Sequence, residues 1–247
     1  MKKIVTPLML AMSLVAAGSA FAQAAPAEPE STMSFNVGAV NEYRYRGISQ
    51  SRLDPALQGG ADYADKSGAY VGVWGSSIKW VKDAGGKSNA EVDYYGGYKF
   101  TVGEVAYDVG FLHYEYSGNG LAVSTNTNEL YGAVTMGPTT LKYSQSTGNL
   151  FGFANSKGSS YVDLTANFDL GDGYTFTPHL GYQSVKGAGN SIYSYTDAAL
   201  TLGKDLGNGL AASAAVIGTN AKTGSYVSPA GKQLGKAGLV VGLKYTF

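Results

Sequence analysis

The chain finishes with the stretch GLVVGLKYTF, residues 238–247, in which every second side chain is large and apolar. Strict alternation indicates a β-strand with one apolar face, because successive strand side chains point to opposite sides. A final strand that closes on a C-terminal Phe resembles the targeting and insertion signal of bacterial outer-membrane barrels. We therefore predict a membrane-insertion signal formed by Leu239, Val241, Leu243, Tyr245 and Phe247.

The same period of two runs through the chain from about residue 34 onward. In one such run, Glu91, Asp93 and Lys99 share one face and mostly apolar residues occupy the other. About twelve segments show this pattern, each about 9–11 residues long, the length that a tilted strand needs to cross a bilayer. They begin near Ser34, Ala56, Ala69, Asn89, Val105, Asn128, Thr139, Tyr161, Tyr174, Tyr195, Leu210 and Gly238. The sequence thus predicts an all-β fold, a transmembrane antiparallel up-and-down β-barrel of about 12 strands over residues 34–247.

The connections between these segments alternate between short and long. The short ones are tight turns at 65–68, 101–103, 137–138, 171–173 and 205–209. The long ones are polar and lie at 47–55, 79–88, 117–126, 145–158, 186–191 and 220–236. This alternation is typical of barrels with short periplasmic turns and longer extracellular loops. The alternative, a soluble β-sandwich, gives no reason for it.

Composition narrows the class further. Glycine makes up 35 of the 247 residues, which is about twice its ordinary share and suits a chain of strands and turns. The absence of cysteine excludes a disulfide scaffold, a cysteine-based zinc site and a cysteine nucleophile. With 18 basic and 18 acidic residues, the chain has no net field to attract nucleic acid, so we expect no such partner. We also expect no cofactor and no bound metal.

The N-terminus has the pattern of a secretory signal peptide. Lys2 and Lys3 precede a mostly apolar stretch, and Ala20-Phe21-Ala22 supplies a small-residue cleavage site. We predict a signal peptide at residues 1–22, the alternative being a short buried helix. Residues 23–33 include two prolines and two glutamates, which suits a periplasmic N-terminal tether. Secretory export of a barrel predicts the outer membrane of a Gram-negative bacterium.

Energetics decide which face of each strand meets lipid. An Arg or Lys turned to the bilayer midplane costs about 2–4 kcal/mol, so the charged face must point into the lumen. The outward faces then carry aromatic residues near both ends of the strands, with Tyr43 and Tyr45 among those near the loops. The predicted pore-lining residues are Glu42, Arg44, Arg46, Asp62, Glu91, Asp93, Lys99, Asp108, Glu129, Lys142, Asp163, Asp169, His179, Asp197 and Lys244.

Several blocks resemble the TorF family of bacterial porins. The most specific block is YRYRGISQS at residues 43–51, and further matches lie at residues 68–77, 91–98 and 202–207. The resemblance covers essentially the whole chain after the signal peptide. It implies a secreted outer-membrane barrel that acts as a channel.

The inward charges are compatible with an open pore or with internal ion pairs that plug the barrel. Twelve strands lie between the eight that leave room only for side chains and the 16–18 of open porins. The inward glycines Gly38, Gly60, Gly97 and Gly181 remove bulk from the interior and favour a channel. We therefore predict a porin-like channel that allows passive diffusion of small polar or charged solutes through a narrow lumen. Its expected partners are these solutes, outer-membrane lipid and, during insertion, the barrel-assembly machinery.

Two other functions remain open from the sequence. One is a non-conducting barrel whose extracellular loops bind a partner. The other is an outer-membrane lipid hydrolase, which would require Ser117 or Ser124 to meet His113 on the outward face. Within the channel hypothesis, Arg44 and Arg46 have two alternative roles. They either place positive charge in a narrow constriction, or they form structural ion pairs with inward acids such as Asp62 and Asp93.

Overall fold

The structure, a computed structural model, describes residues 31–247. The predicted signal peptide and residues 23–30 of the predicted tether lie outside the described residues. The first strand begins at Ser31, so the last three residues of the predicted tether belong to this strand instead. Among residues 31–247, no helix is long and apolar enough to cross a membrane.

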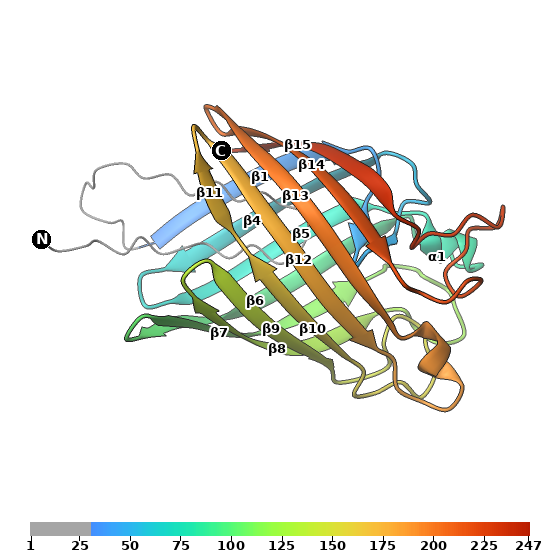
Figure 1. Cartoon of the computed structure of the whole chain (residues 1–247). Helices are drawn as coiled ribbons and strands as arrows, with labels where there is room; N and C mark the ends of the chain where they lie inside the picture. The colour runs from blue at the N-terminus through green and yellow to red at the C-terminus, as the bar shows by residue number, and fades with distance from the viewer. Residues whose placement is uncertain (1–30) are drawn as a thin grey trace, which may run out of the picture.

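One antiparallel sheet closes on itself to form a barrel (Figure 1). Strands β10 and β11 occupy a single position in the ring, because both pair with β12 and continue one another around Asn167. Twelve strand positions result, and each strand pairs with its sequence neighbours. The strands are β1 (Ser31–Val40), β4 (Ala56–Asp65), β5 (Ala69–Ser77), β6 (Ala90–Val102), β7 (Val105–Glu115), β8 (Thr127–Met136), β9 (Thr139–Ser146), β10 (Ser160–Ala166), β11 (Phe168–Gly171), β12 (Tyr174–Ser184), β13 (Tyr195–Gly207), β14 (Leu210–Thr219) and β15 (Gly238–Thr246). The predicted fold class is confirmed.

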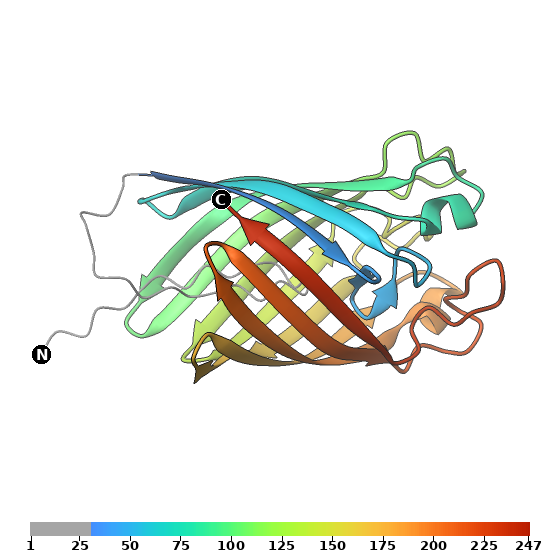
Figure 2. The same ribbon diagram turned by 90° about the horizontal axis from the view of Figure 1, so that it is seen from above.

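The ring closes where the first strand meets the last (Figure 2). Val37 lies opposite Tyr245, and the pairing extends to the last residue of the chain. The backbone N–H of Phe35 donates to Phe247 O (2.8 Å), and that of Phe247 donates to Phe35 O (2.9 Å). Their rings are stacked with centroids 5.8 Å apart. Phe247 therefore completes the seam of the barrel.

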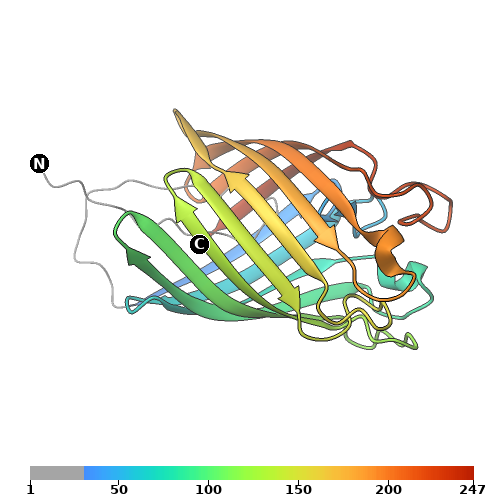
Figure 3. The ribbon, with the colours of Figure 1, turned by 60° about the horizontal axis from the view of Figure 1, so that its bottom comes forward.

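The two ends of the barrel differ as predicted (Figures 1 and 3). Five tight turns, the start of β1 and Phe247 lie at one end, which we call the short-turn end. Gly68 shows why such a turn needs glycine: its φ is +102°, and a Cβ there would lie 2.0 Å from Lys99 O. The long connections lie at the other end, the loop end, with helix α1 (Trp80–Asp83), the 3₁₀ helix η1 (Asn190–Tyr193) and the short strands β2 (Arg44–Tyr45) and β3 (Ile48–Ser49).

Side-chain exposure follows the period of two. Large apolar residues such as Leu57, Leu130 and Leu239 are exposed on the outer wall, as a lipid-facing surface requires. Strand β5 turns Val71 outward, whereas the Tyr70 hydroxyl donates to Asp108 in the interior. The outer surface of the strands is therefore an apolar band, and their polar groups face inward.

Candidate functional site

The polypeptide leaves the barrel wall after Val40 and folds back into the lumen. Residues 42–54, which we call the inner hairpin, contain β2 and β3 joined by the two-residue turn Arg46-Gly47. Both turn residues have positive φ, 47° and 78°, as a two-residue hairpin turn of type I′ requires. A Cβ on Gly47 would lie 2.7 Å from Asp197 Cβ on β13, so only glycine lets the tip approach this strand so closely.

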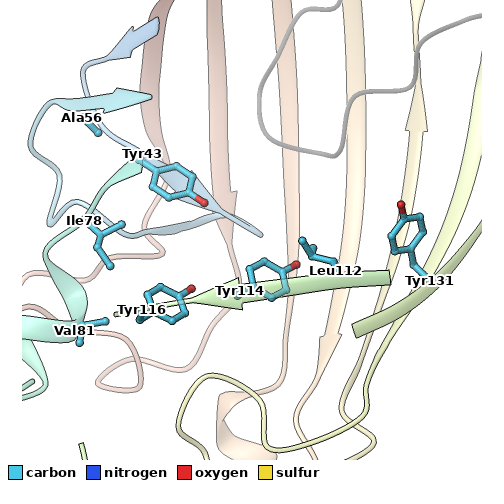
Figure 4. Close-up of a cluster of buried hydrophobic side chains, with 8 residues drawn as sticks. All are labelled: Tyr43, Ala56, Ile78, Val81, Leu112, Tyr114, Tyr116 and Tyr131. Atoms are coloured by element: carbon cyan, nitrogen blue, oxygen red, sulfur yellow. The ribbon is translucent and has the colours of Figure 1, made fainter. Parts of the chain in front are cut away.

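The tyrosines of the inner hairpin point at the lumen wall. The Tyr43 hydroxyl donates to Glu91 Oε1 on β6 (2.6 Å), and the Tyr45 hydroxyl bonds to the Tyr114 hydroxyl on β7. Figure 4 shows Tyr43 in one buried cluster with Tyr114 on β7 and with Tyr116, which follows the end of that strand. Only 2% of the Tyr43 surface is exposed, and burial raises the pKa of its phenol well above the ordinary range. The prediction that Tyr43 and Tyr45 face lipid is wrong, because β1 ends before them.

Arg46 lies at the tip of the inner hairpin and contacts three further strands. Its Nη2 donates to Glu129 Oε2 on β8 (2.7 Å), and its Nη1 donates to Gln183 Oε1 on β12 (2.7 Å). Its guanidinium also lies over the rings of Tyr45 and Tyr161, 4.8 and 4.3 Å from the centroids. Burial alone would lower the pKa of Arg46, but the Glu129 carboxylate together with Tyr45 and Tyr114 outweighs this effect and raises that pKa. Arg46 is thus a charged clamp that spans the lumen.

Arg44 holds the base of the inner hairpin. Its Nη2 donates to Glu42 Oε1 (2.9 Å), and its Nη1 donates to the backbone oxygens of Gly47 (3.1 Å) and Lys236 (2.8 Å). Both arginines therefore form buried ion pairs, as one of the two hypotheses expected. The suggested partners Asp62 and Asp93 are wrong, because Glu42 and Glu129 take these positions.

Carboxylates surround the inner hairpin in the loop half of the barrel. Glu91 accepts from the hydroxyls of Tyr43 and Tyr116, the latter at 2.7 Å. His179 on β12 lies between two acids, with Nδ1 3.4 Å from Asp163 Oδ2 and Nε2 2.9 Å from Asp197 Oδ1. Five acids on the barrel wall of this half are buried: Glu91, Asp93, Glu129, Asp163 and Asp197. The wall is therefore strongly acidic where the inner hairpin meets it.

The short-turn half carries charges of both signs on partly exposed side chains. The hydroxyls of Tyr95 and Tyr70 donate to Asp62 (2.5 Å) and Asp108 (2.6 Å). The ammonium group of Lys99 lies over the Tyr70 ring, 4.6 Å from its centroid. In the same half, Lys142 lies over the Tyr131 ring and Lys244 lies on β15, while Asp169 is exposed near the rim on β11. Polar side chains thus continue from the hairpin to the short-turn end.

Tyrosine rings pack over several inward-facing glycines of the barrel wall. A Cβ on Gly97 would lie 2.5 Å from the Tyr70 hydroxyl, and one on Gly181 would lie 2.0 Å from the Tyr161 hydroxyl. Gly72 and Gly110 are covered in the same way by Tyr95 and Tyr131. The interpretation that Gly97 and Gly181 leave open space is wrong, because rings from neighbouring strands lie across both.

Gly97→Ala is expected to destabilise the barrel by about 1–3 kcal/mol, the usual penalty of overpacking. The added methyl group would meet the Tyr70 hydroxyl and also the backbone oxygen of Val109, 2.5 Å away. Urea unfolding of the protein refolded into lipid vesicles measures the change. Gly132→Ala on β8 is the matched control, because a Cβ there meets nothing within 4 Å. Equal midpoints for the two variants would contradict the steric argument.

His113 does not meet a serine. Its Nδ1 is 2.7 Å from Asn128 Oδ1, and its Nε2 is 3.1 Å from Glu115 Oε2. Ser117 donates to Glu115 instead (3.2 Å). Ser124 Oγ accepts the backbone N–H of Asn126 (3.2 Å). Residues 31–247 thus offer the hydrolase hypothesis no serine–histidine pair, and they contain no group of three or more acids and histidines placed to hold a metal.

Comparisons with known proteins give one family and a set of similar structures. Residues 23–247 match the family described as "Bacterial protein of unknown function (Gcw_chp)". No curated protein matches the sequence.

Among solved structures, a KdgM porin in complex with disordered oligogalacturonate superposes with TM-score 0.55 and 11% identity, covering 88% of this chain and 99% of that chain. The NanC porin gives TM-score 0.56 and 10% identity, covering 87% and 99%. The COG4313 outer membrane channel from Pseudomonas putida F1 gives TM-score 0.50 and 12% identity, covering 91% and 99%. The fold is therefore that of outer-membrane porins and channels.

Proposed function

The chain belongs to the Gcw_chp family, and from its porin-type barrel we propose that it is an outer-membrane channel for small polar or charged solutes. The solutes cross by passive diffusion, after the protein has been exported through the secretory pathway and inserted by the barrel-assembly machinery. The resemblance to the TorF porins supports the same function. The final strand acts as the insertion signal, a role supported by the pairing of Phe247 with Phe35.

The observation that carries this proposal is the polar interior of the short-turn half. Asp62, Lys99, Asp108, Lys142 and Lys244 lie inside the barrel and are partly exposed. A barrel filled only for stability would bury such charges in pairs, whereas partly exposed charges of both signs suit a lumen that holds water and polar solutes. In this proposal the constriction of the path lies in the loop half, where the inner hairpin enters the lumen and Arg46 donates to Glu129.

Planar-bilayer recording tests this function. Purified wild-type protein is expected to give discrete single-channel current steps of small size, because the inner hairpin occupies the loop half of the lumen. Arg44→Ala and Arg46→Ala are expected to change the step size or the anion/cation preference, because both arginines lie at the constriction. Unchanged conductance and unchanged ion preference in both folded variants would show that the two arginines do not line the permeation path.

A non-conducting barrel whose loops bind a partner is the second candidate. It is favoured by the burial of the loop half, where Tyr43, Tyr114 and Glu129 are almost completely enclosed. Its outcome in the same recording is distinct: reconstituted, correctly folded protein would give no current steps at all.

A further inference from the structure

The long loops at the loop end carry an excess of exposed positive charge. The three acids in these loops are Glu42, Asp54 and Asp83, and each already pairs with a nearby base. Glu115, at the end of β7, lies on the outward side of its strand and contacts His113. Seven further lysines in four of the loops are exposed: Lys82, Lys87, Lys157, Lys186, Lys222, Lys232 and Lys236. The loop mouth of the barrel is therefore positively charged.

The longest loop, residues 220–236, places two of these lysines beside the inner hairpin. The backbone N–H of Ser49 donates to Leu234 O (3.0 Å), and Arg44 Nη1 donates to Lys236 O (2.8 Å). Lys232 interacts electrostatically with Asp54, the last residue of the inner hairpin. Because this segment packs on the inner hairpin, Lys232 and Lys236 lie close to the proposed constriction with their side chains open to solvent.

The buried acids of the lumen wall do little to offset this charge. Glu91 and Asp93 are only 1% and 2% exposed, so they present almost no surface to a passing ion. The other three buried acids of the wall contact basic side chains: Glu129 contacts Arg46, and Asp163 and Asp197 contact His179. An ion in the lumen therefore meets few uncompensated carboxylates in the loop half.

The inward charges of the short-turn half do not reverse the sign either. Those that are partly exposed are Asp62 and Asp108 against Lys99, Lys142 and Lys244. The two acids each accept a hydrogen bond from a tyrosine hydroxyl. These five groups leave one net positive charge along the path.

The rim at the short-turn end has the opposite sign. Its turns carry five acids and two lysines: Asp65, Glu104, Asp169, Asp172 and Asp205 against Lys66 and Lys204. This rim lies at the far end of the barrel from the inner hairpin (Figure 1). Since charges in salt solution act over about 10 Å at 0.1 M, the charges nearest the constriction decide which ions pass.

We infer that the channel prefers anions, with Lys232 and Lys236 attracting them to the constriction from the loop side. A mouth lined by charges of one sign concentrates ions of the other sign, and basic side chains serve this purpose in anion pores. This inference rests on the proposed channel function and adds its substrate class: small anions, such as carboxylates and phosphates.

A KCl gradient across a planar bilayer, at about 0.1 M on the dilute side, tests the inference on the intact mature chain. The wild-type reversal potential is expected to shift toward the Cl⁻ equilibrium potential. Replacing Lys232 and Lys236 together (Lys232→Gln, Lys236→Gln) is expected to lower the Cl⁻/K⁺ permeability ratio about twofold or more, the effect of a unit charge acting across ~10 Å of water. The matched control (Lys66→Gln, Lys204→Gln) removes two positive charges from the short-turn rim and should change the ratio much less.

The outcomes separate the channel function from its ion preference. Current steps that prefer K⁺, or neither ion, in the wild-type protein would overturn the anion preference and leave the channel standing. Equal ratios for the two double variants would overturn the role of the loop lysines. The absence of any current steps would overturn the channel function, and the inference with it. The wild-type measurement depends on no variant, so it decides the sign of the preference by itself.

Discussion

Arg46→Ala is expected to lower the free energy of unfolding by about 3–5 kcal/mol, the usual loss when one partner of a buried ion pair is removed. The guanidinium and the Glu129 carboxylate are 2.7 Å apart, and their side chains are only 6% and 1% exposed. The substitution leaves the Glu129 charge buried without a cation, and it also removes the contacts with Gln183 and Tyr161. We expect the inner hairpin to loosen in the same variant.

Urea unfolding in lipid vesicles, followed by tryptophan fluorescence, measures this loss. Trp74 reports on the hairpin directly, because its ring makes an edge contact with Tyr43 at a centroid distance of 5.5 Å. Arg52→Ala is the matched control, because Arg52 belongs to the same hairpin but its ion pair with Asp83 is partly open to solvent, so little stability should be lost. Adding Glu129→Gln to Arg46→Ala should restore part of the loss, because the amide is neutral. If Arg46→Ala is no less stable than Arg52→Ala, the clamp does not hold the hairpin.

The barrel itself could be predicted from the sequence because lipid imposes a simple rule on it. Every strand that crosses the bilayer must turn its charges inward, so the alternation of Glu91, Asp93 and Lys99 with apolar residues determines the face of β6. The tight turns and the closing strand at residues 238–247 follow from equally local signals. These patterns involve neighbouring residues only, and the structure agrees with them.

The inner hairpin could not be predicted from the same rule. The alternation continues past Val40 through Tyr43 and Tyr45, so the pattern looks like more of the first strand. Two signals argue against a single long strand. The alternating run is longer than a bilayer requires, and Arg46-Gly47 can form a two-residue turn. The partners of Arg46 could not be predicted at all, because Glu129 and Gln183 lie 83 and 137 residues further along the chain.

The glycines show a second reason why interior features are hard to predict. The composition gives the number of glycines, and the alternation along each strand shows which glycines face inward. Neither shows which side chains fill the space above them. The ring over Gly97 comes from Tyr70 on the neighbouring strand, in register across β5 and β6. The ring over Gly181 comes from Tyr161 on β10. Only the pairing of strands shows that these glycines accommodate side chains.

Shortening the inner hairpin is expected to increase single-channel conductance several-fold. Val40 and Ala56 already pair across β1 and β4, so a short Gly-Ser turn in place of residues 42–54 can join the two strands. The change removes the side chains that occupy the loop half of the lumen, including Tyr43 and Arg46. Water then hydrates Glu91 and Glu129, so the barrel should fold without the clamp. The matched control shortens residues 186–192, which are mostly exposed and lie in a different loop.

The most direct test of a channel constricted by its own first loop is a side-by-side recording of single-channel conductance. Wild-type protein, the variant with residues 42–54 replaced and the variant with residues 186–192 shortened are reconstituted in the same bilayers and salt. The structure predicts small steps for the wild type, steps of the same size for the 186–192 variant, and several-fold larger steps for the hairpin variant. Steps of equal size in all three, or no steps in a folded hairpin variant, would contradict the account.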